Sequence, residues 1–160
     1  MNIPCRDLIP ILQAVLSAGG RVRFTATGGS MIPFIRSGEV VELEPIAFPD
    51  IQRGDVILAR RADGVYVLHR VGQLSAGSVF LVSDAGRPDG WIEADQIIAR
   101  AVSVFRRGRE LPLNTPGARR TGLIWMRCGS LATGALGLYL ALRRRIRLGG
   151  REQECKSKLA

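Results

Sequence analysis

Hydrophobic and polar residues alternate with a period of two over much of the chain between residues 21 and 113, as is typical of strands with one buried face. The alternation is clearest in 21–27, 39–45, 55–60, 64–72, 78–83 and 95–113. Residues 61–64 predict a hairpin turn, whereas 84–90 (DAGRPDG) consists mainly of turn formers and predicts a loop. We therefore expect a mainly β fold: a compact, strongly bent, antiparallel and barrel-like domain.

The two ends of the chain have a helical pattern instead. Residues 5–18 predict an amphipathic helix that covers the sheet and ends at Gly19-Gly20, and its apolar face comprises Leu8, Ile9, Ile11, Leu12, Val15 and Leu16. Arg6 and Asp7 come early, so we expect no secretory signal peptide. The three predicted parts are the N-terminal helix 1–20, the β domain 21–113, and a linker, apolar helix and basic tail over 114–160.

The apolar run 121–142 is followed at once by four arginines. Arg127 interrupts it and leaves 15 uncharged residues, fewer than the roughly 20 that a spanning helix needs. The run could still span a bilayer if Arg127 reached the interface, or it could lie on the membrane surface or pack as a soluble helix on a partner. We expect a membrane-associated protein that contacts the membrane surface through 121–147, with a cytoplasmic location as the alternative.

The net charge of +9 comes from the end of the chain. Residues 101–160 contain 13 Arg or Lys against 3 Glu, whereas residues 1–100 contain 10 Arg against 11 acidic residues. A basic tail suits anionic lipid or nucleic acid. We expect no nucleic-acid partner, because the tail lacks interleaved aromatic residues and the one N-terminal helix is too short for a helix-turn-helix. Three distant cysteines and a single histidine predict no disulfide framework, no metal site and no cofactor.

Ser30, in the stretch GGSMIPFIRSGEVV (28–41), is a candidate nucleophile. A serine hydroxyl needs an adjacent base to become nucleophilic, and His and Lys are the usual bases. Both lysines lie at the polar C-terminal end, so His69, on a predicted strand, is the conventional base left for Ser30. The glycines before Ser30 leave main-chain N–H groups accessible, and the N–H of Ser30 could stabilise an oxyanion.

An imidazole that acts as a base also needs a partner that fixes its tautomer. Asp84 and Asp89, in the predicted loop 84–90, are both candidates, and Asp55 is a third that better fits a turn or a polar network. Each of these residues also fits an ordinary role in a turn or strand. The residues alone therefore leave the chemistry open.

Four segments together resemble the signal peptidase I family, in the His form of the archaeal and endoplasmic-reticulum enzymes, within the superfamily that includes the LexA-type repressors. They are GGSMIPFIRSGEVV, RGDVILAR, VLHRVG and LVSDAGRPDG, which occur in the family's order. The resemblance as a whole covers roughly residues 22–105. Two positions depart from the family pattern: Glu39 stands in place of Asp, and Ser83 in place of Gly. An amphipathic helix stands where the family has its N-terminal membrane anchor.

The resemblance implies a serine endopeptidase that cleaves a precursor or signal peptide. It implies that Ser30 is the nucleophile, His69 the general base and Asp89 the orienting acid, with Asp84 supporting the loop. It further implies a substrate-binding surface around the nucleophile, comprising Gly28, Gly29, Met31 and Pro33, that accepts an extended peptide with small side chains such as Ala. Two other functions remain open: a LexA-like self-cleaving or regulatory domain, and a non-catalytic β domain tethered to a membrane.

Overall fold

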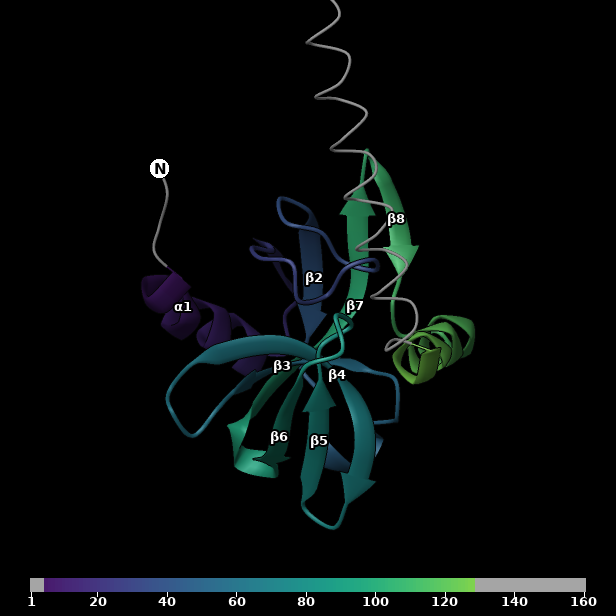
Figure 1. Cartoon of the computed structure of the whole chain (residues 1–160). Helices are drawn as coiled ribbons and strands as arrows, with labels where there is room; N and C mark the ends of the chain where they lie inside the picture. Colours follow the sequence, from purple (N-terminus) through teal and green to yellow (C-terminus); the bar gives the residue numbers. More distant parts are fainter. Residues whose placement is uncertain (1–4, 129–160) are drawn as a thin grey trace, which may run out of the picture.

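The computed structural model describes residues 5–128, and Figure 1 shows their arrangement. The helix α1 (Cys5–Ser17) precedes eight strands. These are β1 (Val22–Thr25), β2 (Val40–Glu44), β3 (Val56–Arg60), β4 (Tyr66–Ser75), β5 (Ser78–Val82), β6 (Pro88–Glu93), β7 (Ile97–Arg106) and β8 (Arg109–Pro112). Short 3₁₀ turns lie at Phe48–Asp50 and Ala94–Gln96. The predicted mainly β, antiparallel fold is confirmed.

The strands form one sheet in the order β1-β2-β7-β3-β4-β5-β6, and β8 pairs with β7. Within the described residues this sheet is not closed into a barrel, because β1 and β6 are its two ends. Register shifts between Glu42 and Leu43 and between Leu58 and Ala59 interrupt the pairing of β2 and of β3 with β7. Such irregularities bend a sheet, and Figure 1 shows β2, β7 and β8 in one part of the molecule and β3 to β6 in the other.

The strand β6 corrects the prediction of a loop over 84–90. Pro88 starts this strand, and Gly90 pairs with Leu81 of β5, so Asp89 lies on a strand. The hydrophobic pattern did not predict β6, because β6 is an edge strand with one buried hydrophobic residue, Ile92. Proline is tolerated at such a position, because an edge strand leaves some of its N–H groups unpaired. Each of the six predicted strand segments overlaps at least one observed strand, and β4 continues three residues beyond the predicted end at residue 72.

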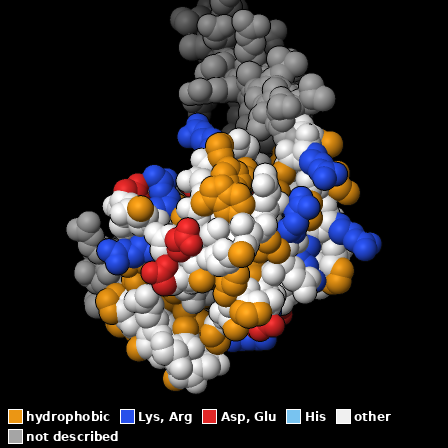
Figure 2. Space-filling model, turned by 90° about the horizontal axis from the view of Figure 1, so that it is seen from below, with side chains coloured by type: hydrophobic (Ala, Val, Ile, Leu, Met, Phe, Trp, Pro, Cys, Tyr) orange, Lys and Arg blue, Asp and Glu red, His pale blue; other side chains and the backbone are white. Residues whose placement is uncertain are grey.

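Two hydrophobic clusters stabilise the bent sheet. One includes Val41, Leu43, Val56 and Val104 of β2, β3 and β7, and the other includes Ile57 and further residues of β3 to β6. Figure 2 views the molecule from below and shows other hydrophobic side chains exposed between charged ones. The edge strand β6 contributes to the exposed hydrophobic surface through Trp91, which is half-exposed and packs edge-on against Phe80.

The N-terminal helix was predicted correctly in its extent and largely in its role. Leu12 and Leu16 are buried in the first cluster, and Ile9 is also buried. The helix ends where Gly19 adopts a φ of 79° and the N–H of the next glycine binds a carbonyl of the last turn. The prediction was wrong for two positions, because Ile11 and Val15 point away from the core and are exposed.

A second helix occupies 116–128, at the end of the described residues (Figure 1, light green). Thr115 caps its start, where the side-chain Oγ1 accepts a hydrogen bond of 3.3 Å from the N–H of Ala118, and Pro116 occupies the first helical position. The segment expected as a linker therefore contains the first residues of this helix. In the described part of the chain no helix is long and apolar enough to cross a membrane. The rest of the predicted apolar helix, 129–142, lies outside the described residues.

Candidate functional site

Ser30 lies on a turn that its neighbours anchor in the core. Met31 and Ile35 are buried in the first hydrophobic cluster, and the N–H of Ile35 donates a hydrogen bond of 2.8 Å to the carbonyl of Met31. Ser30 itself is exposed. Gly28 has a φ of 90°, which side chains rarely adopt, and a Cβ there would meet nothing within 4 Å. The sequence Ser-Met therefore places a hydroxyl outside and a thioether inside.

His69 lies on β4, opposite Ile57 of β3, and is almost completely buried. Its Nδ1 pairs with a carboxylate oxygen of Asp89, which β6 brings from two strands away. The second carboxylate oxygen of Asp89 accepts a hydrogen bond of 3.2 Å from Arg61, in the β3–β4 turn. Asp89 is therefore oriented from two sides. Nothing in the sequence pattern indicated Arg61, because its role depends on where β6 runs.

Asp84 has a different partner from Asp89. The guanidinium of Arg70 donates two hydrogen bonds of 2.7 and 2.8 Å to its carboxylate and a third, of 2.8 Å, to the carbonyl of Gly54. Both side chains are buried, and burial raises the pKa of the Asp84 carboxyl, whereas the hydrogen bonds from Arg70 oppose that shift. Of the two aspartates considered for the imidazole, the geometry pairs Asp89 with His69 and uses Asp84 to hold the loop.

Ser30 and His69 line the same pocket, which has a volume of about 270 Å³. Gly28 and Met31 also line it, whereas Gly29 and Pro33 are not among its lining residues. Most of the wall is apolar and was not identified from the sequence; it includes Phe24, Ala26, Ile35, Leu58, Tyr66 and Leu68. The hydrogen bonds of the described residues include none between Ser30 and His69. Such bonds often tighten only when substrate is bound.

The two departures from the family pattern have structural partners. Glu39 accepts hydrogen bonds from Arg106 and from the N–H of Arg36, and the bond with Arg106 holds the pKa of Glu39 below its usual value of 4.5, against the effect of burial. Ser83 is buried, and its Oγ accepts a hydrogen bond of 2.9 Å from the N–H of Arg87. Each side chain therefore stabilises a turn beside the site.

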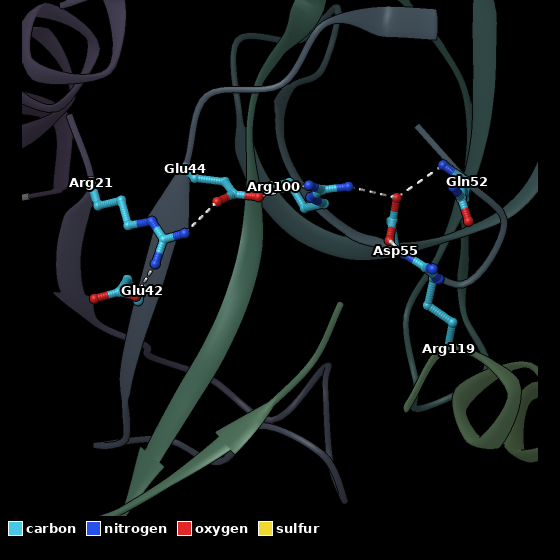
Figure 3. A network of polar contacts seen from close by, with 7 residues as sticks. All are labelled: Arg21, Glu42, Glu44, Gln52, Asp55, Arg100 and Arg119. Atoms are coloured by element: carbon cyan, nitrogen blue, oxygen red, sulfur yellow. Dashed lines mark hydrogen bonds and ion pairs between the residues drawn. The ribbon is translucent and has the colours of Figure 1, made fainter. Parts of the chain in front are cut away.

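Asp55 belongs to a polar network and not to the pocket. Figure 3 shows its carboxylate between the N–H of Gln52, at 2.9 Å, and the side chains of Arg100 and Arg119, at 3.6 and 3.2 Å. Arg100 continues the network to Glu44 on β2. The interpretation of Asp55 as a turn and network residue agrees with this geometry, and Arg119 connects the network to the helix 116–128.

No model of a known protein family matches the sequence, and no curated protein matches it either. A function for this chain therefore has to be inferred from the site and from the sequence pattern.

Proposed function

We propose that this chain is a serine endopeptidase of signal-peptidase type, which cleaves a precursor or signal peptide by acyl transfer. One observation carries the proposal: Ser30 and His69 line the same pocket, and Nδ1 of His69 pairs with Asp89. A Ser-His-Asp centre requires a carboxylate that holds the imidazole and an imidazole that can reach the nucleophile. The Asp89 pair and the shared pocket are compatible with this arrangement. The resemblance of the four sequence segments to the signal peptidase I family supports the same function.

In the proposed reaction His69 moves a proton twice. Because Nδ1 is paired with Asp89, Nε2 is the nitrogen that accepts the proton of Ser30 as Oγ attacks the scissile carbonyl. The imidazolium then gives this proton to the leaving amine, the C–N bond breaks, and an ester on Ser30 remains. His69 then takes a proton from a water molecule as the water oxygen attacks the ester. The bond between Oγ and the acyl carbon breaks, the acid product leaves, and His69 returns the proton to Oγ. The N–H of Ser30 is the proposed oxyanion donor.

The sheet has room for an extended substrate beside the pocket. In the described residues β1 is an end strand that pairs only with β2, and Phe24 of β1 lines the pocket. The first part of β4 pairs with β3, whereas its pairing with β5 begins at Arg70, so Tyr66 and Leu68 lie beside an unpaired edge. A peptide can add to such an edge through main-chain hydrogen bonds, and the apolar wall would then favour apolar side chains. The family resemblance adds the expectation that these side chains are small, such as Ala.

The test compares wild type with Ser30→Ala and His69→Ala on peptides that carry Ala-x-Ala before the scissile bond. Removal of either group should lower turnover by roughly 10³- to 10⁶-fold, because nucleophile and base act as one unit. Equal turnover by all three proteins would refute the peptidase proposal. Cleavage of the purified chain itself, abolished in Ser30→Ala, would instead identify a self-cleaving regulator.

We also propose that the protein associates with a membrane surface through 121–147, most of which lies outside the described residues. The apolar run and the arginines after it support this proposal. A chain that ends at residue 128 keeps the described domain and should leave the membrane fraction; unchanged fractionation would reject this segment as the anchor.

A further inference from the structure

The helix 116–128 packs against the two loops that carry the site. Its Trp125 meets the ring of Phe34, on the Ser30 turn, edge-on at a centroid distance of 6.2 Å and an interplanar angle of 87°. The indole Nε1–H of Trp125 also donates a hydrogen bond of 2.8 Å to the carbonyl of Asp84. One side chain of this helix therefore contacts both the nucleophile turn and the loop that leads to Asp89.

The bond to Asp84 continues directly to Ser30. The peptide group between Asp84 and Ala85 accepts the indole bond through its carbonyl, and its N–H donates a hydrogen bond of 2.9 Å to the carbonyl of Ser30. In a trans peptide the carbonyl and the N–H point in opposite directions, so this one planar group lies between Trp125 and Ser30. Hydrogen bonds in such a chain polarise and strengthen one another.

The same helix also supports the strand that carries His69. Arg70 follows His69 on β4, and a methyl group added at Gly122 would overlap its guanidinium. The helix therefore approaches Arg70 as closely as only glycine permits. At its first turn, Arg119 donates a hydrogen bond of 3.2 Å to Asp55, which fixes the helix on the β domain.

We propose that Trp125 is a positioning residue for Ser30: its indole N–H sets the Asp84–Ala85 peptide, and this peptide sets the main chain of the nucleophile. The proposal rests on the proposed peptidase function, but the coupling of Trp125 to Ser30 can be measured without any activity. Sequence reasoning assigned Trp125 to an apolar segment, because nothing in the linear pattern indicates that its N–H reaches a loop 41 residues away.

The test uses the full chain with Trp125→Phe, which keeps an aromatic ring against Phe34 but removes the N–H. The matched control is Ile124→Ala, because Ile124 is the adjacent residue and its side chain is 63% exposed. On the peptide substrate, Trp125→Phe should lower kcat about three- to tenfold, which corresponds to one neutral hydrogen bond, and leave KM within about twofold. On this soluble peptide and without membranes present, Ile124→Ala should behave as wild type.

The independent measurement is amide hydrogen exchange at Ala85, read by NMR. Its N–H donates to Ser30, so Trp125→Phe should accelerate its exchange about fivefold or more, whereas the Ile124→Ala control should not. Trp125→Tyr, which also lacks the indole N–H, is the second variant if Trp125→Phe does not fold. Unchanged exchange and kcat in the folded variants would overturn the proposal. If wild type does not cleave the peptide but Trp125→Phe still accelerates exchange at Ala85, the coupling of Trp125 to Ser30 is supported and only the peptidase function is refuted.

Discussion

The ion pair between Arg70 and Asp84 provides the most direct test of how the site is held together. Both side chains are at most 1% exposed, and two hydrogen bonds of 2.7 and 2.8 Å join them. Asp84→Asn removes the negative charge and leaves the guanidinium buried. Breaking a buried pair from one side typically costs about 3 to 5 kcal/mol, because the remaining charge has no counter-ion. For a domain of this size, that corresponds to a fall in Tm of roughly 10 to 20 °C.

Urea unfolding followed by circular dichroism measures this cost. The midpoint should fall with little change in slope, because the mutation does not alter the surface exposed on unfolding. The matched control is Asp63→Asn, which breaks the 2.6 Å pair of Asp63 with Arg61 at the surface and should cost less than about 1 kcal/mol. A loss below about 1 kcal/mol in Asp84→Asn as well would refute the reasoning.

Asp89→Asn should mainly lower turnover, because it changes the partner of His69.

Two further predictions concern the glycine of the helix and a pH-dependent turn. Gly122→Ala should destabilise the chain by about 1 to 3 kcal/mol, because the added methyl group overlaps Arg70. The control is Gly117→Ala, whose methyl group meets nothing within 4 Å and which should be neutral or stabilising. Equal melting temperatures of the two variants would contradict the close approach of the helix to Arg70. The pKa of Glu39 is lowered by Arg106, so the folded chain binds fewer protons at Glu39 and this stabilisation is lost as the pH falls below 4.5. The difference in unfolding free energy between wild type and Glu39→Gln should therefore shrink as the pH falls from about 6 to about 3. A difference that stays constant over this range would refute the pH-dependent contribution of Glu39.

Much of the fold could be predicted because strands with one buried face have a pattern of period two. Val41 and Leu43 of β2, for example, alternate with polar residues and are both completely buried. The strand β6 could not be predicted in this way, since it lies at the end of the sheet and has one buried hydrophobic side chain. A pattern of hydrophobic residues indicates which side chains are buried. An edge strand that is held mainly by main-chain hydrogen bonds buries few side chains, so it has no such pattern.

The candidate site, like the fold, could be predicted from the sequence only in part. Chemical type alone selects Ser30 and His69, because the body of the chain has one histidine and no lysine. The choice of partner required the tertiary structure, since only the course of β6 brings Asp89 to the imidazole and leaves Asp84 to Arg70. The supporting role of Trp125 was beyond sequence reasoning for a similar reason. Its hydrogen bond to Asp84 spans 41 residues of sequence and its contact with Phe34 is more distant still, so no local pattern specifies them.

The docking of the helix 116–128 has a practical consequence for the choice of expression fragments. A fragment that ends at residue 113, just after the last strand, would lack the hydrogen bond from Arg119 to Asp55. It would also lack Gly122, which covers the guanidinium of Arg70, and would expose this group to water. Such a fragment could retain its β sheet and still give a false negative in an enzyme assay. Shortened versions of this protein should therefore extend at least to residue 128.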